Sequence, residues 1–390
     1  MQPIKILRKL ALLIGLLEIC SFSPFVFGEG EDIYFAGVAF TGNALDTSSV
    51  LPYTSEILSA ESQALLNRQF HQSLLEKPPQ NLTIVFDRLA NLDDGSSALV
   101  LAATIDRETV IVDKIGDVYK ILVEVAGQAI FFDFRERQII SSYPVTVQYI
   151  DARETEPSSD DISKIFESIL FGLGESSFIP LITKKMETVT LPQAAARRIR
   201  VSAVEVSESV KSNYSLLNQT LFDTGVIGHE FSKILSDELN LSILPFQSGQ
   251  ALGGTMAARF ANGDIYNLTI PEPDYEIRLY IEDFKGRTLN ETPAFRQELF
   301  GAYFRISVTE PLSGRSFFDR NLKQGATKVI PSTQADFDAD QAYYETLLVG
   351  LSGFSASSAN EKENWITQQD EPRKLKREFA SLQELIELCR

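Results

Sequence analysis

The stretch with the most chemical potential is a glycine-rich segment between residues 249 and 259. The residues in it that could contact a ligand are Gly249, Gly253, Gly254, Thr255 and Arg259. The segment follows an expected strand and precedes an expected short helix over 256–260, where exposed backbone amides could bind an anion. No Gly-Lys-Ser/Thr follows the glycines, which excludes a Walker motif. A tight turn that requires glycine geometry is the competing and favoured interpretation.

Other combinations of reactive residues in the sequence are incomplete. The two histidines, His71 and His229, belong to no recognisable catalytic motif, and there is no Gly-x-Ser-x-Gly elbow or His-Glu-x-x-His zinc spacing. Asp336, Asp338 and Asp340 resemble the start of a calcium loop, but the sixth position is not glycine and the twelfth is not glutamate. An acidic helix N-terminus explains these aspartates better. We therefore predict no catalytic residue, no metal and no cofactor.

The charge of the chain limits the classes of partner. Acidic residues number 53 and basic residues 36, which gives a formal net charge of −17. A nucleic-acid partner is not expected, because phosphate requires a locally basic face. Paired carboxylates are too frequent in such a chain to identify a site. A carboxylate-based secreted hydrolase stays open as an alternative, because the distance between two carboxylates cannot be obtained from sequence.

The first 28 residues have the organisation of a secretory signal peptide. A basic region with Lys5, Arg8 and Lys9 precedes an apolar run over 10–17, and cleavage is expected near Glu29. No later segment is long and apolar enough to span a membrane. An uncleaved inner-membrane anchor is the alternative to cleavage.

The cysteine content bears on the compartment. After cleavage Cys389 is the one cysteine left, so no disulfide can form within the chain. Export without disulfides favours a bacterial periplasm, with an extracellular location as the alternative.

One eight-residue pattern occurs twice, at 166–173 and at 344–351. Each position keeps its class: aromatic, acidic, hydroxyl, aliphatic, leucine, bulky apolar, glycine and leucine. Each copy ends an expected helix that begins with acidic residues after a Pro-Ser pair. We interpret the pattern as the end of one structural unit that the chain contains twice.

The periodicity of apolar residues predicts the same order of elements in both units. Each has a strand, a helix, a strand, several antiparallel strands and a closing helix, which predicts an α/β to α+β fold. The leading strands are expected at 33–40 and 199–206, and the apolar face of the second unit's helix over 227–239. The predicted organisation is a signal peptide (1–28), a first repeat domain (29–176), a connector (177–197), a second repeat domain (198–354), a flexible linker (355–372) and an amphipathic C-terminal helix (373–390).

The C-terminal helix has an apolar seam. Its members recur at spacings of four and three and are Leu375, Phe379, Leu382, Ile386 and Cys389. Two heptads are short for a stable dimer, so we expect the helix to dock on its own chain. The alternative is a partner helix or a homodimer, which Cys389 could cross-link under oxidising conditions.

A family resemblance rests on this order of elements, on the leading strand at 33–40 and on the edge Leu244-Pro245-Phe246. Together they resemble the periplasmic α/β domains of the CsgG type and the amino-terminal domain of TolB, here as two tandem copies. Those families include envelope assembly and scaffold proteins. The resemblance implies an exported, non-catalytic binding or scaffold protein of the bacterial cell envelope with a protein partner. No functional residue carries over from it.

Overall fold

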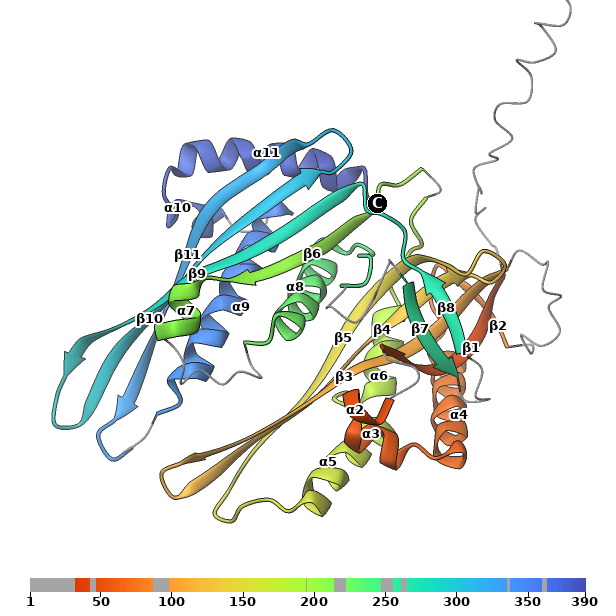
Figure 1. Cartoon of the computed structure of the whole chain (residues 1–390), viewed down its shortest axis with the longest axis horizontal. Helices are drawn as coiled ribbons and strands as arrows, with labels where there is room; N and C mark the ends of the chain where they lie inside the picture. Colours follow the sequence, from red (N-terminus) through yellow and green to blue (C-terminus); the bar gives the residue numbers. More distant parts are fainter. Residues whose placement is uncertain are drawn as a thin grey trace, which may run out of the picture.

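The structure is a computed structural model that describes residues 32–42, 47–86, 98–193, 195–213, 222–246, 255–260, 265–334, 337–359 and 363–390. Two twisted sheets lie with helices packed against them, which confirms the predicted α/β to α+β fold (Figure 1). The predicted signal peptide at 1–28 lies outside the described residues. Within the described ranges, no helix combines the length and the hydropathy that a membrane span requires.

The first unit begins with a strand, continues through helices and returns as an antiparallel meander. β1 lies parallel to both β2 and β3. β4 pairs antiparallel with β3 on one side and with β5 on the other. Helices α4, α5 and α6 cover one face of this sheet (Figure 1). The elements in chain order are β1 (Asp32–Gly42), α2 (Thr47–Val50), α3 (Pro52–Ile57), α4 (Ala60–Glu76), β2 (Thr83–Val85), β3 (Leu99–Ile115), β4 (Val118–Asp133), β5 (Gln138–Arg153), α5 (Ser159–Phe171) and α6 (Phe178–Met186).

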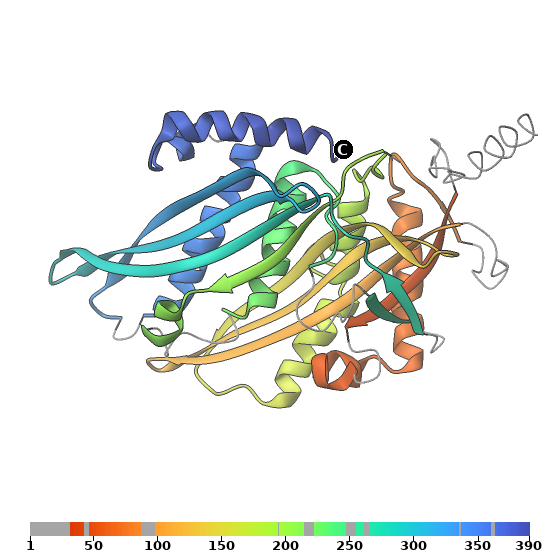
Figure 2. The same cartoon turned by 45° about the horizontal axis from the view of Figure 1, so that its top comes forward.

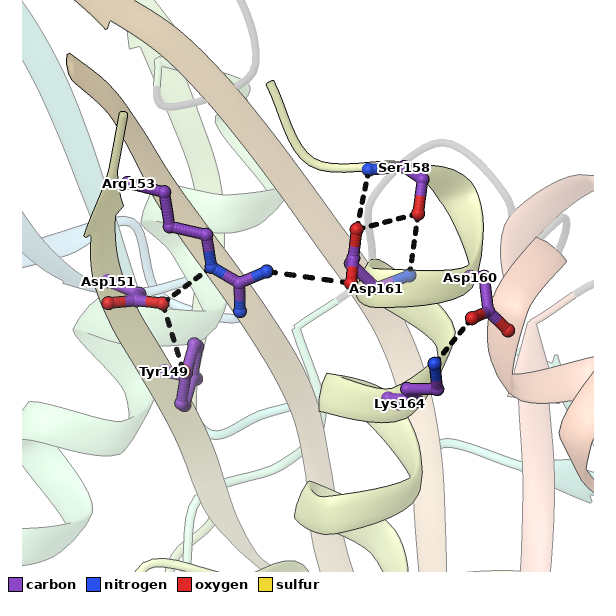
Figure 3. Close-up of polar contacts among 7 residues, drawn as sticks. All are labelled: Tyr149, Asp151, Arg153, Ser158, Asp160, Asp161 and Lys164. Carbon is purple, nitrogen blue, oxygen red and sulfur yellow. Dashed lines mark hydrogen bonds and ion pairs between the residues drawn. The ribbon is translucent and has the colours of Figure 1, made fainter. Parts of the chain in front are cut away.

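Serine residues begin both long helices of this unit. Ser59 accepts a hydrogen bond from the backbone amide three residues on, and Ser158 forms a capping box with Asp161. The guanidinium of Arg153, at the end of β5, lies 2.8 Å from Asp151 and 3.7 Å from Asp161 (Figure 3). The hydrogen bond from Arg153 lowers the pKa of the Asp151 carboxyl. These contacts join the end of the meander to the first turn of α5.

The second unit repeats this order. β6 lies parallel to β9, and β9, β10 and β11 form the meander. Helices α8 and α9 pack against this sheet. The elements are β6 (Ile199–Val206), α7 (Glu208–Asn213), α8 (Thr224–Leu239), β7 (Thr255–Phe260), β8 (Ile265–Thr269), β9 (Tyr275–Glu291), β10 (Phe295–Glu310), β11 (Arg315–Pro331), α9 (Ala339–Ser358), α10 (Glu363–Thr367) and α11 (Pro372–Glu387).

The two sheets have the same strand order. The first contains β2-β1-β3-β4-β5, and the second is β6-β9-β10-β11. A parallel bridge between Arg200 of β6 and Leu244 occupies the place that β2 has beside β1. Each sheet therefore combines a parallel pair with an antiparallel meander in the same sequence of connections.

β-Bulges recur at matching places in the two sheets. A bulge adds one unpaired residue to a strand and re-aims the side chains that follow it. Both leading strands, β1 and β6, contain a bulge. The first meander strands, β3 and β9, each contain a bulge at an acidic residue, and the last meander strands, β5 and β11, each contain a further bulge. The bulged residues, as first-unit and second-unit pairs, are Ala36 and Ser202, Asp106 and Glu282, and Ile140 and Phe317.

The units stack so that helices of the second unit lie between the two sheets. α8 contacts both β5 of the first sheet and β6 of the second, and α9 runs beside it (Figures 1 and 2). The first sheet is therefore covered on both faces, and β4 is buried without interruption from Ile121 to Asp133. The second sheet has helices on one face, and the start of β9 alternates between buried and more exposed positions. Burial on both faces requires a nearly continuous apolar strand, whereas one covered face requires alternation.

The hairpin β7–β8 belongs to the second unit in sequence but pairs with the first sheet. β7 is antiparallel to β1, and β8 meets β5 at Gln138 and Thr269. The expectation of a short helix over 256–260 is therefore wrong. Ala258 and Leu268 are fully buried between the strands, and the free edge of β1 supplies partners for the β7 backbone.

The expectation of a flexible linker at 355–372 is also wrong for the part that the structure describes. Residues up to Ser358 continue α9, and the hydroxyls of Ser355 and Ser358 each donate to the carbonyl four residues earlier. Small residues are needed here because Trp365 of α10 packs on the helix, where a Cβ at Gly353 would lie 2.4 Å from its ring nitrogen. The predicted connector at 177–197 likewise contains α6, whose apolar face is buried in the first core.

The C-terminal helix α11 docks on its own chain. Leu375, Phe379, Leu382 and Ile386 are buried in the core of the second unit. The guanidinium Nε of Arg320 donates to Glu378 at 2.7 Å, which joins β11 to α11. Cys389 is 3% exposed. The surface that could form a dimer seam is thus covered by α9 and β11.

Truncation of Phe379 tests this docking. Its ring lies 5.2 Å from that of Phe318 and 5.7 Å from that of Phe354, so Phe379→Ala leaves a cavity between α11, β11 and α9. We expect a loss of about 3 to 5 kcal/mol in the free energy of unfolding. The matched control Glu384→Ala, at an exposed position of the same helix, should change it by less than about 0.5 kcal/mol. Equal effects in urea titrations would contradict the docking.

Candidate functional site

The two units meet in a buried polar cluster built by β4, β5 and α8. Glu124 of β4 lies directly opposite Gln148 of β5, and the Gln148 amide donates to the Glu124 carboxylate at 2.7 Å. Two residues before Gln148, on the same face of the strand, the Thr146 hydroxyl donates to Glu230 of α8. The ammonium of Lys233, one turn further along α8, lies 3.5 Å from the Glu230 carboxylate.

The start of α8 is held against the first sheet. Asp223 caps the helix by accepting from the amides of Gly225 and Val226 at 2.9 and 3.1 Å. Arg107 of β3 reaches the same carboxylate at 3.3 Å. A Cβ on Gly225 would lie 2.2 Å from the Arg107 guanidinium, so a larger residue there would displace the Arg107 side chain. The opposite face of α8 is apolar and buried in the second core, as its periodicity predicts.

Burial controls the protonation of the cluster. Glu124 and Glu230 are each only 4% exposed. Burial, and then repulsion from Glu230, raises the pKa of Glu124 to about 7, which the hydrogen bond from Gln148 partly offsets. Burial also lowers the pKa of His229, whose Nε2 lies 3.3 Å from the carbonyl oxygen of Val145. Near neutral pH, Glu124 is therefore protonated in about half of the molecules.

A cavity of about 460 Å³ opens beside this cluster. Its polar wall comes from β5 and α8, and its apolar wall from α8 and α9. The lining residues are Thr146, Gln148, Glu230, Lys233, Ile234, Leu348, Val349 and Ser352. Glu124 lies behind Gln148 and is not among them. The cavity thus presents one buried carboxylate, one ammonium group and an apolar surface to solvent.

The predicted glycine-rich site does not coincide with this cluster. Gly249, Gly253 and Gly254 lie outside the described residues. Thr255 and Arg259 are placed in β7, where Arg259 pairs with Phe40 of β1, and their side chains lie outside the described part. The prediction of an anion site there stays a prediction.

The other residues that the sequence analysis considered as site candidates take part in packing or helix capping where the structure describes them. The ring of His71 packs 4.1 Å from that of Phe86. Asp338 caps α9 and accepts from Lys120 of β4 at 2.7 Å, and Asp340 lies in the first turn of that helix. Asp336 lies outside the described residues. Across the described ranges, no group of three or more His, Cys, Asp or Glu residues is arranged to hold a metal ion.

Comparisons with known proteins identify no family. No protein-family model matches the sequence, and no curated protein matches it. Similar solved structures include a minor lipoprotein from Acinetobacter baumannii, at 10% identity over 45% of this chain and 96% of that one, with a TM-score of 0.20. A hypothetical protein from Chlamydia trachomatis has 11% identity over 40% and 91%, with a TM-score of 0.22.

A neuraminyllactose-binding hemagglutinin homolog from Helicobacter pylori has 14% identity over 41% of this chain and 83% of that one, with a TM-score of 0.24. Likenesses at this level assign neither a family nor an activity. The resemblance to CsgG-type and TolB domains therefore stays a prediction.

The protonation of Glu124 predicts how stability depends on pH. Its pKa in the folded chain is raised from 4.5 to about 7. Protonated Glu124 therefore makes its full contribution to the free energy of unfolding below pH 4.5, and this contribution is lost as the pH rises through 7. The full shift corresponds to about 3 kcal/mol. Urea titrations should show the wild type losing stability from pH 5 to pH 8, and Glu124→Gln should lose much less. The control Glu384→Gln, on an exposed position, should keep the wild-type slope; equal slopes in all three proteins would contradict the assignment.

Proposed function

We propose that this chain is an exported, non-catalytic binding or scaffold protein of the bacterial cell envelope, built from two copies of one unit. The shared strand order and the three matched bulges support an internal duplication, because bulges are retained within families. The signal-like sequence at 1–28 and the single remaining cysteine support a periplasmic location. A protein partner in the envelope is the expected ligand.

The observation that carries this proposal is a pair of β-hairpins, one at the end of each sheet, that no helix covers in the part of the chain that the structure describes. The β3–β4 and β9–β10 hairpins both extend beyond the helices on the same side of the molecule (Figures 1 and 2). In β9 every residue from Lys285 to Glu291 is exposed, so this strand of the hairpin is open to solvent. Exposed aliphatic side chains are present on both hairpins, with Val112 of β3 38% and Leu289 of β9 42% exposed.

Such ribbons are suited to contact with another protein. An exposed strand edge offers unpaired backbone groups to an added strand. Aliphatic side chains beside charged ones give the mixture of apolar centre and polar rim that protein interfaces use. Lys285 and Arg287 supply charges on the second ribbon, and charges of this kind keep an exposed strand from aggregating.

The carboxylate-based hydrolase is supported by one observation, the raised pKa of Glu124 beside Glu230. A general acid must lie within hydrogen-bonding distance of the proton that it transfers. Glu124 does not line the cavity, and its carboxylate is hydrogen-bonded to Gln148, which does line it. Glu230 is already bonded to Thr146 and Lys233. The geometry therefore favours binding over hydrolysis.

A homodimer through α11 and Cys389 would need α11 to leave its own core. The contacts that would have to break include Phe379 against Phe318 and the ion pair of Arg320 with Glu378. A partner at the sheet ends requires no such rearrangement.

Photo-crosslinking in intact cells tests the proposed surface. A photoreactive residue at Val112 or at Leu289 should give one discrete crosslinked species of the same partner mass. The control is Leu65, which is 41% exposed on α4, on the helix-covered face of the first sheet. Crosslinking at Leu65 with none at the two ribbons would contradict the proposal. A species at twice the mass of the mature chain would indicate self-association instead of a distinct partner.

A further inference from the structure

β11 forms the outer edge of the second sheet (Figure 1). At one point of this edge, the side-chain amide of Gln369 takes the place of a neighbouring strand. The Lys323 N–H donates to the Gln369 Oε1 at 3.0 Å, and the Gln369 Nε2 donates to the Lys323 carbonyl at 3.0 Å. Both backbone groups of Lys323 therefore point away from β10.

The backbone of β11 beyond Lys323 presents the same groups to solvent. This stretch pairs with β10 without a register shift, so every second residue points outward as Lys323 does. These residues are Gly325, Thr327 and Val329, and all three are exposed. The Gly325 carbonyl accepts from the side chain of Gln324 at 2.8 Å. Among the described residues, nothing bonds the outward N–H and C=O groups of Thr327 and Val329.

The edges of the first sheet each receive a segment from outside their own meander. The edge of β1 pairs with β7, which comes from the second unit. The edge of β5 is met by β8 at Gln138 and by the Ile243 amide, which donates to the Ser142 carbonyl at 3.0 Å. Within the described ranges, no strand lies beside β11 after Gly325. An extended peptide has backbone groups that alternate as those of this edge do, and so it is the ligand that fits.

The side chains beside the edge favour a strand of another protein over a second copy of this chain. Two β11 strands paired antiparallel would place their Lys328 ammonium groups opposite or diagonal to each other, and like charges there are destabilising. Within one chain, Lys328 lies 2.7 Å from Glu345 of α9. The other face of the strand carries Val329, which is 61% exposed, and Leu299 of β10 lies opposite Thr327 on that face. This face suits an aliphatic side chain.

We propose that the β11 edge from Gly325 to Val329 accepts an extended strand of the envelope partner. That strand carries an aliphatic side chain beside Val329 and no basic side chain beside Lys328. It extends the second sheet next to the β9–β10 hairpin, because Pro331 at the end of β11 lies opposite Phe295 at the start of β10. The inference rests on the proposed function, which supplies the partner, and it names how that partner is bound.

Removal of one outward N–H tests the added strand, with the full chain in intact cells and a photoreactive residue at Leu289. Thr327→Pro should leave the pairing with β10 intact, because an edge strand tolerates proline where its N–H faces solvent. It should reduce the crosslinked partner species by about tenfold, because the partner's acceptor loses its hydrogen bond. The matched control Thr327→Val should keep the wild-type yield. A photoreactive residue at Val329 should capture the same species.

Hydrogen exchange provides a second measurement that needs no proline variant. In the complex purified through the Leu289 crosslink, the amides of Thr327 and Val329 should exchange about tenfold more slowly than in the free chain. The amide of Lys323 is already bonded to Gln369 and should change little.

The outcomes distinguish the added strand from the proposed function. A partner species at Leu289 whose yield Thr327→Pro leaves unchanged, or a complex in which the Thr327 and Val329 amides stay unprotected, would overturn the added strand and leave the proposed function intact. The absence of any species at Leu289, Val112 and Val329 would overturn both. A species at Val329 with twice the mass of the mature chain would place a second copy on this edge and contradict a distinct partner.

Discussion

The second face of the first sheet must be covered, and the rest of the structure depends on how this is done. α4, α5 and α6 cover one face, and α8 of the second unit covers the other. The β7–β8 hairpin adds to the same sheet from within the second unit. The first unit thus depends on the second to cover one face of its sheet, and the two form one stack.

The second sheet shows the opposite adaptation. Among the described residues no helix covers its outer face, which carries charged residues in pairs, with Arg278 2.9 Å from Glu276 and Arg305 2.6 Å from Asp319. At the places that match Glu276 and Arg278 the first sheet has the buried Val100 and Ala102. Terminal units of stacked repeats need such a polar outer face to stay soluble. The asymmetry matches the environment of each sheet, which is apolar where both faces are covered and charged where one face meets solvent.

The contact between the units is polar where an apolar one would be more stable. Buried charges are costly to desolvate, and well-packed apolar residues in their place often raise stability. Glu124, Glu230 and the unsatisfied Tyr344 hydroxyl lie where α8 and α9 meet the first sheet. The same groups make the stacking sensitive to protonation around neutral pH.

Sequence alone predicted the elements whose signals are local. The strands at 33–40 and 199–206 and the apolar face of α8 follow from the periodicity of apolar residues. β7 was mistaken for a helix because its partner, β1, is distant in sequence. The small residues after Gly353 indicated a linker but serve a close helix contact with Trp365.

The candidate site could not be predicted, because it combines β4 and β5 with a helix of the other unit. One signal was present: Glu124 interrupts an apolar run between Val123 and Val125, which is unusual for a buried strand. Its partners Gln148 and Glu230 become identifiable only once the strand register and the stacking are known.

Separate expression of the two units tests the stacking most directly. Residues 198–390 should be soluble and unfold cooperatively, because the second sheet has its own helices and a polar outer face. Residues 29–197 should aggregate or bind a hydrophobic dye, because one face of the first sheet is bare, and co-expression with 198–390 should restore a soluble complex. A soluble, monomeric and cooperatively unfolding 29–197 fragment would contradict the account.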